Sequence, residues 1–189
     1  MMDVNRHESE SIAKDLPLRP DDLVHFRLGR LLVLLDVVQQ QQNLKPLDIE
    51  RLGYYDFFAA SPFLIFGPES REYRNILLAG FEVKNLSYQS SAQRFTNRRA
   101  RLQYDLALLI SYGTVHAAVS QKRVTYDITQ TGQGIVSSMQ AMYAFAYRRS
   151  ASITVSYLNK LGDGKLQEEA KHWLKAESLL IDVSDLGLH

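Results

Sequence analysis

The sequence has no cysteine and no long hydrophobic run. The first absence excludes disulfide frameworks, thiolate zinc sites and cysteine nucleophiles, and it fits the reducing cytoplasm, where we expect the protein. The most apolar stretch, Leu28 to Val38, is about 11 residues long and includes Arg30 and Asp36, whereas roughly 20 apolar residues are needed to span a bilayer. We therefore predict a buried core helix there and no membrane partner.

An excess of charge of one sign is missing as well. With 22 Lys and Arg against 21 Asp and Glu, the net charge is only +1. A nucleic-acid contact would therefore have to come from a local basic patch, since the surface as a whole is not basic.

Signatures of catalysis and of cofactor binding are also absent. The histidines show no His-x-x-x-His spacing, so we predict no metal site. Gly132-Gln133-Gly134 lacks the third glycine and the lysine of a phosphate-binding loop, and a helix start explains it better. His116 and Asp127 have no accompanying nucleophile in a recognisable context. We predict no catalytic residue and no cofactor.

The chain does contain a series of helical patterns. Asp48 offers an N-cap oxygen to a second helix, which should end at Pro62, and a third helix should end at Gly80. A long fourth helix follows, with one apolar face that starts near Phe95 and ends near Gly113.

A β-hairpin is predicted directly after this fourth helix, because residues 115–119 and 124–128 alternate or are β-prone. A two-residue loop at Gln121-Lys122 would place Val115 opposite Ile128 and Val119 opposite Val124. Gln-Lys lacks the glycine that tight hairpin turns prefer, so the loop length stays open.

Helices resume after the hairpin. Thr129 or Thr131 should cap a helix that ends at Arg148 and Arg149, where their charges would meet its C-terminal dipole. The predicted fold is mainly α, a winged helix-turn-helix core with one β-hairpin wing and additional N- and C-terminal helices. We expect a flexible leader over residues 1–22, a helical domain over 23–150 and a C-terminal extension over 151–189 that packs on the same unit.

Arginines gather on the predicted fourth helix. Spacings of 4, 3 and 4 place Arg94, Arg98, Arg101 and Asp105 on one stripe, and the planar guanidinium group binds phosphate well. The alternative is an ordinary solvated face, partly neutralised by an Arg101–Asp105 pair, and both interpretations stay open. The candidate contacts to DNA or to an acidic partner are Arg94, Arg98, Arg99, Arg101, Lys122 and Arg123.

An aromatic cluster lies in and after the predicted second helix. Such a cluster can stack on bases, but in so apolar a region it more often forms core or a protein interface, and we favour interface plus core. The candidate interface residues are Tyr54, Tyr55, Phe57, Phe58, Phe63 and Phe66.

Two resemblances to known families follow from these motifs. Residues 109–115, the hairpin, and the run from Val124 to Gly132 resemble the winged-helix pattern, in which the second wing strand ends in Leu-Thr-x-x-Gly; Ile128 replaces that leucine. Winged helices bind DNA, RNA and proteins alike, so this resemblance indicates a fold more than a function.

The second resemblance rests on residues 28–36 and 47–58 and spans most of residues 25–150. They resemble the middle components of bacterial three-component ABC systems, including Lamassu-type antiviral defence. The resemblance implies a non-catalytic adaptor between an ABC ATPase of the SMC or Rad50 type and an effector that is often a nuclease. The arginine-rich helix adds double-stranded DNA as a further candidate contact. The alternative is a stand-alone dimeric winged-helix transcription regulator, whose fourth helix would enter the major groove.

Overall fold

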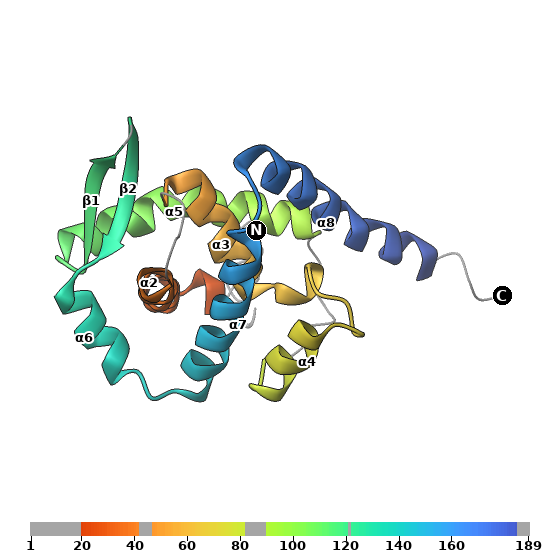
Figure 1. Ribbon diagram of the computed structural model, residues 1–189, viewed down its shortest axis with the longest axis horizontal. Helices are drawn as coiled ribbons and strands as arrows, with labels where there is room; N and C mark the ends of the chain where they lie inside the picture. The colour runs from red at the N-terminus through yellow and green to blue at the C-terminus, as the bar shows by residue number, and fades with distance from the viewer. Residues whose placement is uncertain (1–19, 42–46, 82–89, 121, 185–189) are drawn as a thin grey trace, which may run out of the picture.

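The structure is a computed structural model that describes residues 20–41, 47–81, 90–120 and 122–184, with side chains described as far as residue 175. Its described part is mainly helical and contains one two-stranded antiparallel hairpin, consistent with the predicted winged-helix-like arrangement (Figure 1). In chain order the elements are η1 (Pro20–Asp22), α2 (Val24–Gln40), α3 (Ile49–Ala60), η2 (Pro62–Leu64), α4 (Arg71–Leu78), α5 (Ser91–Ser111), β1 (Val115–Ser120), β2 (Arg123–Ile128), α6 (Gln130–Ser138), α7 (Met142–Leu158) and α8 (Asp163–Ser184).

Helix α2 is the central element of the core. All its residues from Leu31 to Val38 are buried, which confirms the prediction of a helix covered on several sides. It contacts α3, α5, α6, α7 and β2, and Figure 1 shows it end-on, with α5 crossing the view above it. Because apolar residues cover most of its circumference, this helix is stable only when neighbours surround it.

Local side-chain caps set where several helices begin. Asp48 accepts a hydrogen bond from the backbone N–H of Arg51, and Thr129 accepts one from that of Gly132. Each bond satisfies a backbone donor that has no partner within its own helix. The predicted starts of α3 and α6 are therefore confirmed.

The hairpin has the predicted register. Val115 lies opposite Ile128, Ala117 opposite Tyr126 and Val119 opposite Val124. The base of the hairpin is buried in the core, whereas Val119 near the tip is 79% exposed. Gln121 lies outside the described residues, and Lys122 takes a positive φ of 65°, as the residues of tight hairpin turns commonly do.

The prediction of one helix from residue 130 to Arg149 is wrong. Helix α6 ends at Ser138, the chain is non-helical over residues 139–141, and α7 then continues past Arg149 to Leu158. The two arginines therefore lie in the middle of α7 and do not meet a C-terminal helix dipole. Helix α7 also runs through residue 150, so no break separates the predicted helical domain from its C-terminal extension there.

The two ends of the described chain pack on this body. Pro20–Asp22, the end of the predicted leader, form η1, which contacts α2; residues 1–19 lie outside the described part. At the other end, α8 packs against α5 and η2, and the ring of Trp173 meets that of Phe58 edge-on at 5.2 Å. Among the described residues, no helix combines the length and the apolar composition that crossing a membrane requires.

Candidate functional site

The predicted arginine stripe on α5 faces partly into the protein. Arg98 makes a two-pronged ion pair with Asp56 of α3, with distances of 2.5 and 3.1 Å from Nε and Nη2 to the carboxylate oxygens. Asp56 is buried, and Arg30 of α2 lies 3.6 Å from its second oxygen. Arg98 therefore joins α5 to the core and does not present its charge to solvent.

The other α5 arginines also have acceptors or rings within the chain. Arg99 donates to the carboxylate of Glu50, and Arg101 donates to Asp22 at 3.3 Å. Arg94 donates to the Ser91 hydroxyl at 3.3 Å and lies over the ring of Phe57.

The expected pair between Arg101 and Asp105 is wrong. Asp105 is buried and accepts two hydrogen bonds, at 2.8 and 2.9 Å, from Arg27 of α2. Burial explains the choice of partner, because a buried carboxylate needs a desolvated, geometrically matched cation, and Arg101 is exposed.

Of the two basic residues at the hairpin tip, Arg123 is paired with carboxylates of the chain and Lys122 is exposed. Arg123 donates to Asp48 at 2.8 Å and to Asp163 at 3.2 Å, and Asp163 also accepts from the buried Arg51. These contacts tie β2 to the starts of α3 and α8. Lys122 is exposed at the tip.

The neighbouring arginines favour the charged form of the buried Asp56 carboxylate. Burial alone would raise its pKa, but the guanidinium groups of Arg98 and Arg30 outweigh burial, so the pKa lies below its usual value. Burial raises the pKa of the neighbouring Tyr147 hydroxyl well above 10. Within the described residues this hydroxyl has no hydrogen-bond partner.

The predicted aromatic cluster lies mainly inside the protein. Tyr55, Phe57, Phe58 and Phe66 are buried, so a partner that binds the folded chain cannot reach them. Tyr54 stacks on Phe95 of α5, and Phe63 contacts Tyr73 of α4; both are only partly buried. Most of the cluster therefore belongs to the core. Of the six candidate interface residues, only Tyr54 and Phe63 are accessible enough to contact a partner.

The outward face of α5 is the surface that the sequence reasoning missed. With its arginines on the inner face and the flanks, the exposed stripe of this helix is uncharged, and Tyr104 is 61% exposed there. Ile110 and Tyr112 continue the exposed apolar surface to the end of the helix. The stripe consists of Gln93, Thr96, Ala100, Gln103, Tyr104, Ala107, Ile110 and Ser111.

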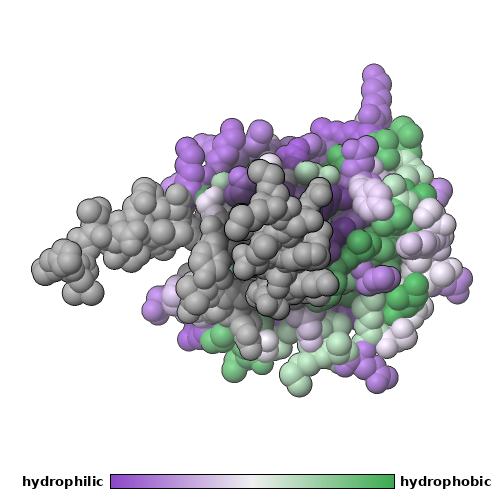
Figure 2. Space-filling model, turned by 180° about the vertical axis from the view of Figure 1, so that it is seen from behind, coloured by the Kyte–Doolittle hydropathy of each residue, from purple (hydrophilic) through white to green (hydrophobic). Residues whose placement is uncertain are grey.

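The space-filling view agrees with this distribution. Figure 2 shows hydrophobic and neutral colours on the side of the molecule that carries the hairpin, with hydrophilic residues gathered along the upper edge. The sequence does indicate this face, because the uncharged residues 100, 104 and 107 follow helical spacing. The arginines beside them form the more conspicuous pattern.

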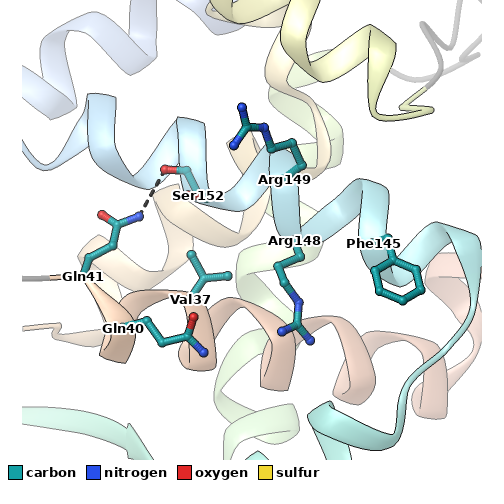
Figure 3. Close-up of a pocket in the computed structure, with 7 residues that line it drawn as sticks. All are labelled: Val37, Gln40, Gln41, Phe145, Arg148, Arg149 and Ser152. Atoms are coloured by element: carbon teal, nitrogen blue, oxygen red, sulfur yellow. Dashed lines mark hydrogen bonds between the residues drawn. The ribbon is translucent and has the colours of Figure 1, made fainter.

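A shallow pocket lies on α2 and α7. It encloses about 420 Å³ and is lined by Val37, Gln40, Gln41, Phe145, Arg148, Arg149 and Ser152. Figure 3 shows that Arg148 and Arg149 extend to opposite sides of α7, so the two guanidinium groups do not converge on one ligand. Arg148 instead lies 3.6 Å from the buried Asp36.

No group of three or more metal-ligating side chains lies together within the described residues. The arrangement as a whole provides internal ion pairs and an exposed neutral helix face, which suits recognition of another macromolecule.

One known protein family matches the chain. The model of Middle Component 2 of ABC three-component systems matches residues 81–177, slightly more than half of the 189-residue chain. The chain belongs to this family of middle components. The matched region covers α5, the hairpin, α6, α7 and most of α8, and thus the whole outward face of α5. No curated protein and no solved structure matches the chain.

Proposed function

We propose that this protein is a non-catalytic accessory subunit that holds the ABC ATPase of a three-component system together with its effector, and that the outward face of α5 binds the ATPase. The observation that carries the proposal is the uncharged exposed stripe of α5, within the region that defines the family. Exposed tyrosine side chains such as those of Tyr104 and Tyr112 are typical of residues that contribute most to protein interfaces.

The internal pairing of the arginines favours a protein partner over DNA. Binding to duplex DNA draws much of its affinity from cations that neutralise phosphates. Arg98, Arg99 and Arg101 are each paired with a carboxylate of the same chain, and the exposed stripe between them has no charge. The alternative of a dimeric winged-helix regulator would place this same helix in the major groove, where arginines beside the stripe would have to contact the phosphates.

The type of ATPase and the chemistry of the effector are proposed from the resemblance of the sequence to Lamassu-type defence systems. On that basis the ATPase is of the SMC or Rad50 type, the effector is a nuclease, and the complex acts against phage in the cytoplasm. A DNA contact, where the complex makes one, would use Lys122 at the hairpin tip, because its side chain is exposed, whereas the neighbouring Arg123 is paired with Asp48 and Asp163.

Co-purification of the three components tests this proposal. The tagged chain is co-expressed with the ATPase and the effector encoded beside it, and Tyr104→Glu with Ile110→Glu should remove the ATPase, because the new charges would be buried in the interface. The matched control is Met142→Glu with Phe145→Glu, which changes two apolar residues on α7 that are as a pair more exposed than Tyr104 and Ile110. Loss of the ATPase with the α7 variant alone would overturn the assignment, as would salt-sensitive DNA binding by the isolated chain that depends on Tyr104.

A further inference from the structure

Three arginines from two helices meet on the two-residue turn Asp21–Asp22. Arg27 of α2 donates from Nη1 to the backbone carbonyls of Asp21 and Asp22, at 3.2 and 3.3 Å. Arg30 donates to the Asp21 carboxylate at 2.5 Å. Arg101 of α5 donates to the Asp21 carbonyl at 3.1 Å and to the Asp22 carboxylate at 3.3 Å. The turn is thus held through its main chain and through both side chains.

Two of the arginines, Arg27 and Arg30, lie deeper in the protein than the turn they hold, whereas Arg101 is about as exposed as Asp22. The Arg30 side chain is 4% exposed, whereas the side chain of Asp21 is 58% exposed. Leu23 and Val24, which connect the turn to α2, are exposed, so apolar burial contributes little to holding the turn in place. The contact depends mainly on charge, and the pair between Arg101 and Asp22, which is exposed on both sides, contributes little net stability.

Release of this turn would leave an excess of positive charge behind. Among the described residues, Arg27, Arg30, Arg98 and Arg101 are ion-paired with the carboxylates of Asp21, Asp22, Asp56 and Asp105. Without the turn, Arg27, Arg30 and Arg98 would share the two buried carboxylates of Asp56 and Asp105, and Arg101 would lose its ion pair with Asp22. An acidic ligand in the place of the turn would restore the balance.

We propose that Arg27, Arg30 and Arg101 form a binding site for an acidic peptide segment of a partner protein, and that Asp21–Asp22 occupies this site as an exchangeable latch. The bound turn itself indicates the ligand class, because three of the five hydrogen bonds end on main-chain carbonyl oxygens and two on aspartate carboxylates. Three of these five acceptors are neutral carbonyl oxygens, whereas a phosphate backbone would bring a charged acceptor to each position, so a peptide matches the site better than a nucleic acid.

This inference goes beyond the proposed function and is tested without any other subunit. A fluorescent, acetylated and amidated peptide with the sequence of residues 20–24 serves as the probe, and its anisotropy is followed as the purified full-length chain is added. Asp21→Asn with Asp22→Asn removes both latch carboxylates without adding positive charge. This variant should bind the peptide at least about tenfold more tightly than the natural chain, because the competing intramolecular contact is weakened.

Two matched substitutions distinguish binding at this site from general attraction between the acidic peptide and a more positive protein. Added to the latch variant, Arg101→Gln should abolish the gain, whereas Arg99→Gln, which removes the same charge from the same helix, should preserve it. A second comparison is Glu69→Gln with Glu168→Gln, which alters the net charge as the latch variant does but at exposed positions elsewhere. It should give no gain, and a peptide with asparagine in place of both aspartates should not bind.

Peptide affinities of these variants either support or overturn the proposed binding site. The inference is overturned if the folded latch variant gains no affinity, or if Arg99→Gln and Arg101→Gln weaken binding equally. Should the double variant fail to fold, Asp22→Asn alone provides a milder test, because Asp22 is half-exposed and its carboxylate pairs with the exposed Arg101. A gain of at least about threefold that Arg101→Gln removes would then support the site, and no gain would overturn it.

Discussion

At the scale of single residues, Asp56 and Glu50 make similar contacts in very different surroundings. Both are carboxylates of α3 that accept hydrogen bonds from arginines of α5. Asp56 is buried, whereas the side chains of Glu50 and its partner Arg99 are 58% and 40% exposed. Removing one partner of a buried pair leaves an uncompensated charge, whereas an exposed pair is replaced by water at little cost.

Asp56→Asn should therefore lower the free energy of unfolding by about 3–5 kcal/mol, the usual result when one partner of a buried ion pair is removed. Glu50→Gln, the matched control, should cost less than about 1 kcal/mol. Urea denaturation followed by far-UV circular dichroism measures both values. Equal losses in the two variants would contradict the internal role that we assign to the Asp56 cluster.

The effect of Asp56 should also depend on pH. Its pKa in the folded chain lies below the ordinary value of 3.8, although burial alone would raise it, because Arg98 and Arg30 favour the charged form. The stabilisation from this carboxylate is therefore complete above about pH 4 and is lost as the pH falls through the folded-state pKa. The stability difference between the natural chain and Asp56→Asn should be full near neutral pH and shrink below about pH 4. A difference that stays constant down to about pH 2 would contradict the shift.

At the scale of the elements, Gly132 and Gly134 in α6 offer a matched pair. A Cβ on Gly132 would lie 2.4 Å from the backbone oxygen of Thr114 and 2.6 Å from Ile128, because the helix start packs closely against the base of the hairpin. A Cβ on Gly134 would have nothing within 4 Å. The first glycine thus permits close packing between α6 and the hairpin, and the second lies in open space.

Gly132→Ala should destabilise the protein by about 2 kcal/mol or more, because backbone and a buried side chain must move apart. Gly134→Ala should instead stabilise it by about 0.5–1 kcal/mol, since alanine favours helix and reduces the freedom of the unfolded chain. Thermal unfolding of both variants checks this. The packing that we describe would be wrong if Gly132→Ala were as stable as Gly134→Ala.

Elements with local signals were predictable from the sequence. Asp48 and Thr129 cap helices through atoms three residues away, and the hairpin register follows from alternation within 14 residues. The break between α6 and α7 was missed because residues 139–141 contain neither glycine nor proline. The local pattern there continues a helix, so the break is set by packing that a single sequence does not reveal.

At the scale of the whole molecule, the candidate site was harder to predict than the fold. Helical spacing correctly grouped the α5 arginines, but their acceptors lie far away in sequence: Arg98 and Asp56 are 42 positions apart, and Arg27 and Asp105 are 78 apart. Spacing along one helix cannot identify a partner on another. It therefore predicted the near pair Arg101–Asp105, whereas the fold selects buried partners from other helices.

The relation of α8 to the rest of the molecule leads to a final prediction. Trp173 is the only tryptophan of the chain, and it lies in α8 with its ring against Phe58 of α3. Its fluorescence therefore reports on the docking of α8, while far-UV circular dichroism reports on all helices. If residues 151–189 belong to the same cooperative unit as the core, as we propose, the two signals should change at the same urea concentration.

Phe58→Leu sharpens this test, because it removes the aromatic contact from the side of the core and leaves Trp173 in place. In a single cooperative unit, both signals should shift together to lower urea, by an amount that corresponds to about 1–2 kcal/mol for a partly filled buried site. If only the fluorescence transition moved, α8 would detach before the core unfolds. The middle component would then carry a separately releasable C-terminal helix, and the division into one packed unit would be wrong.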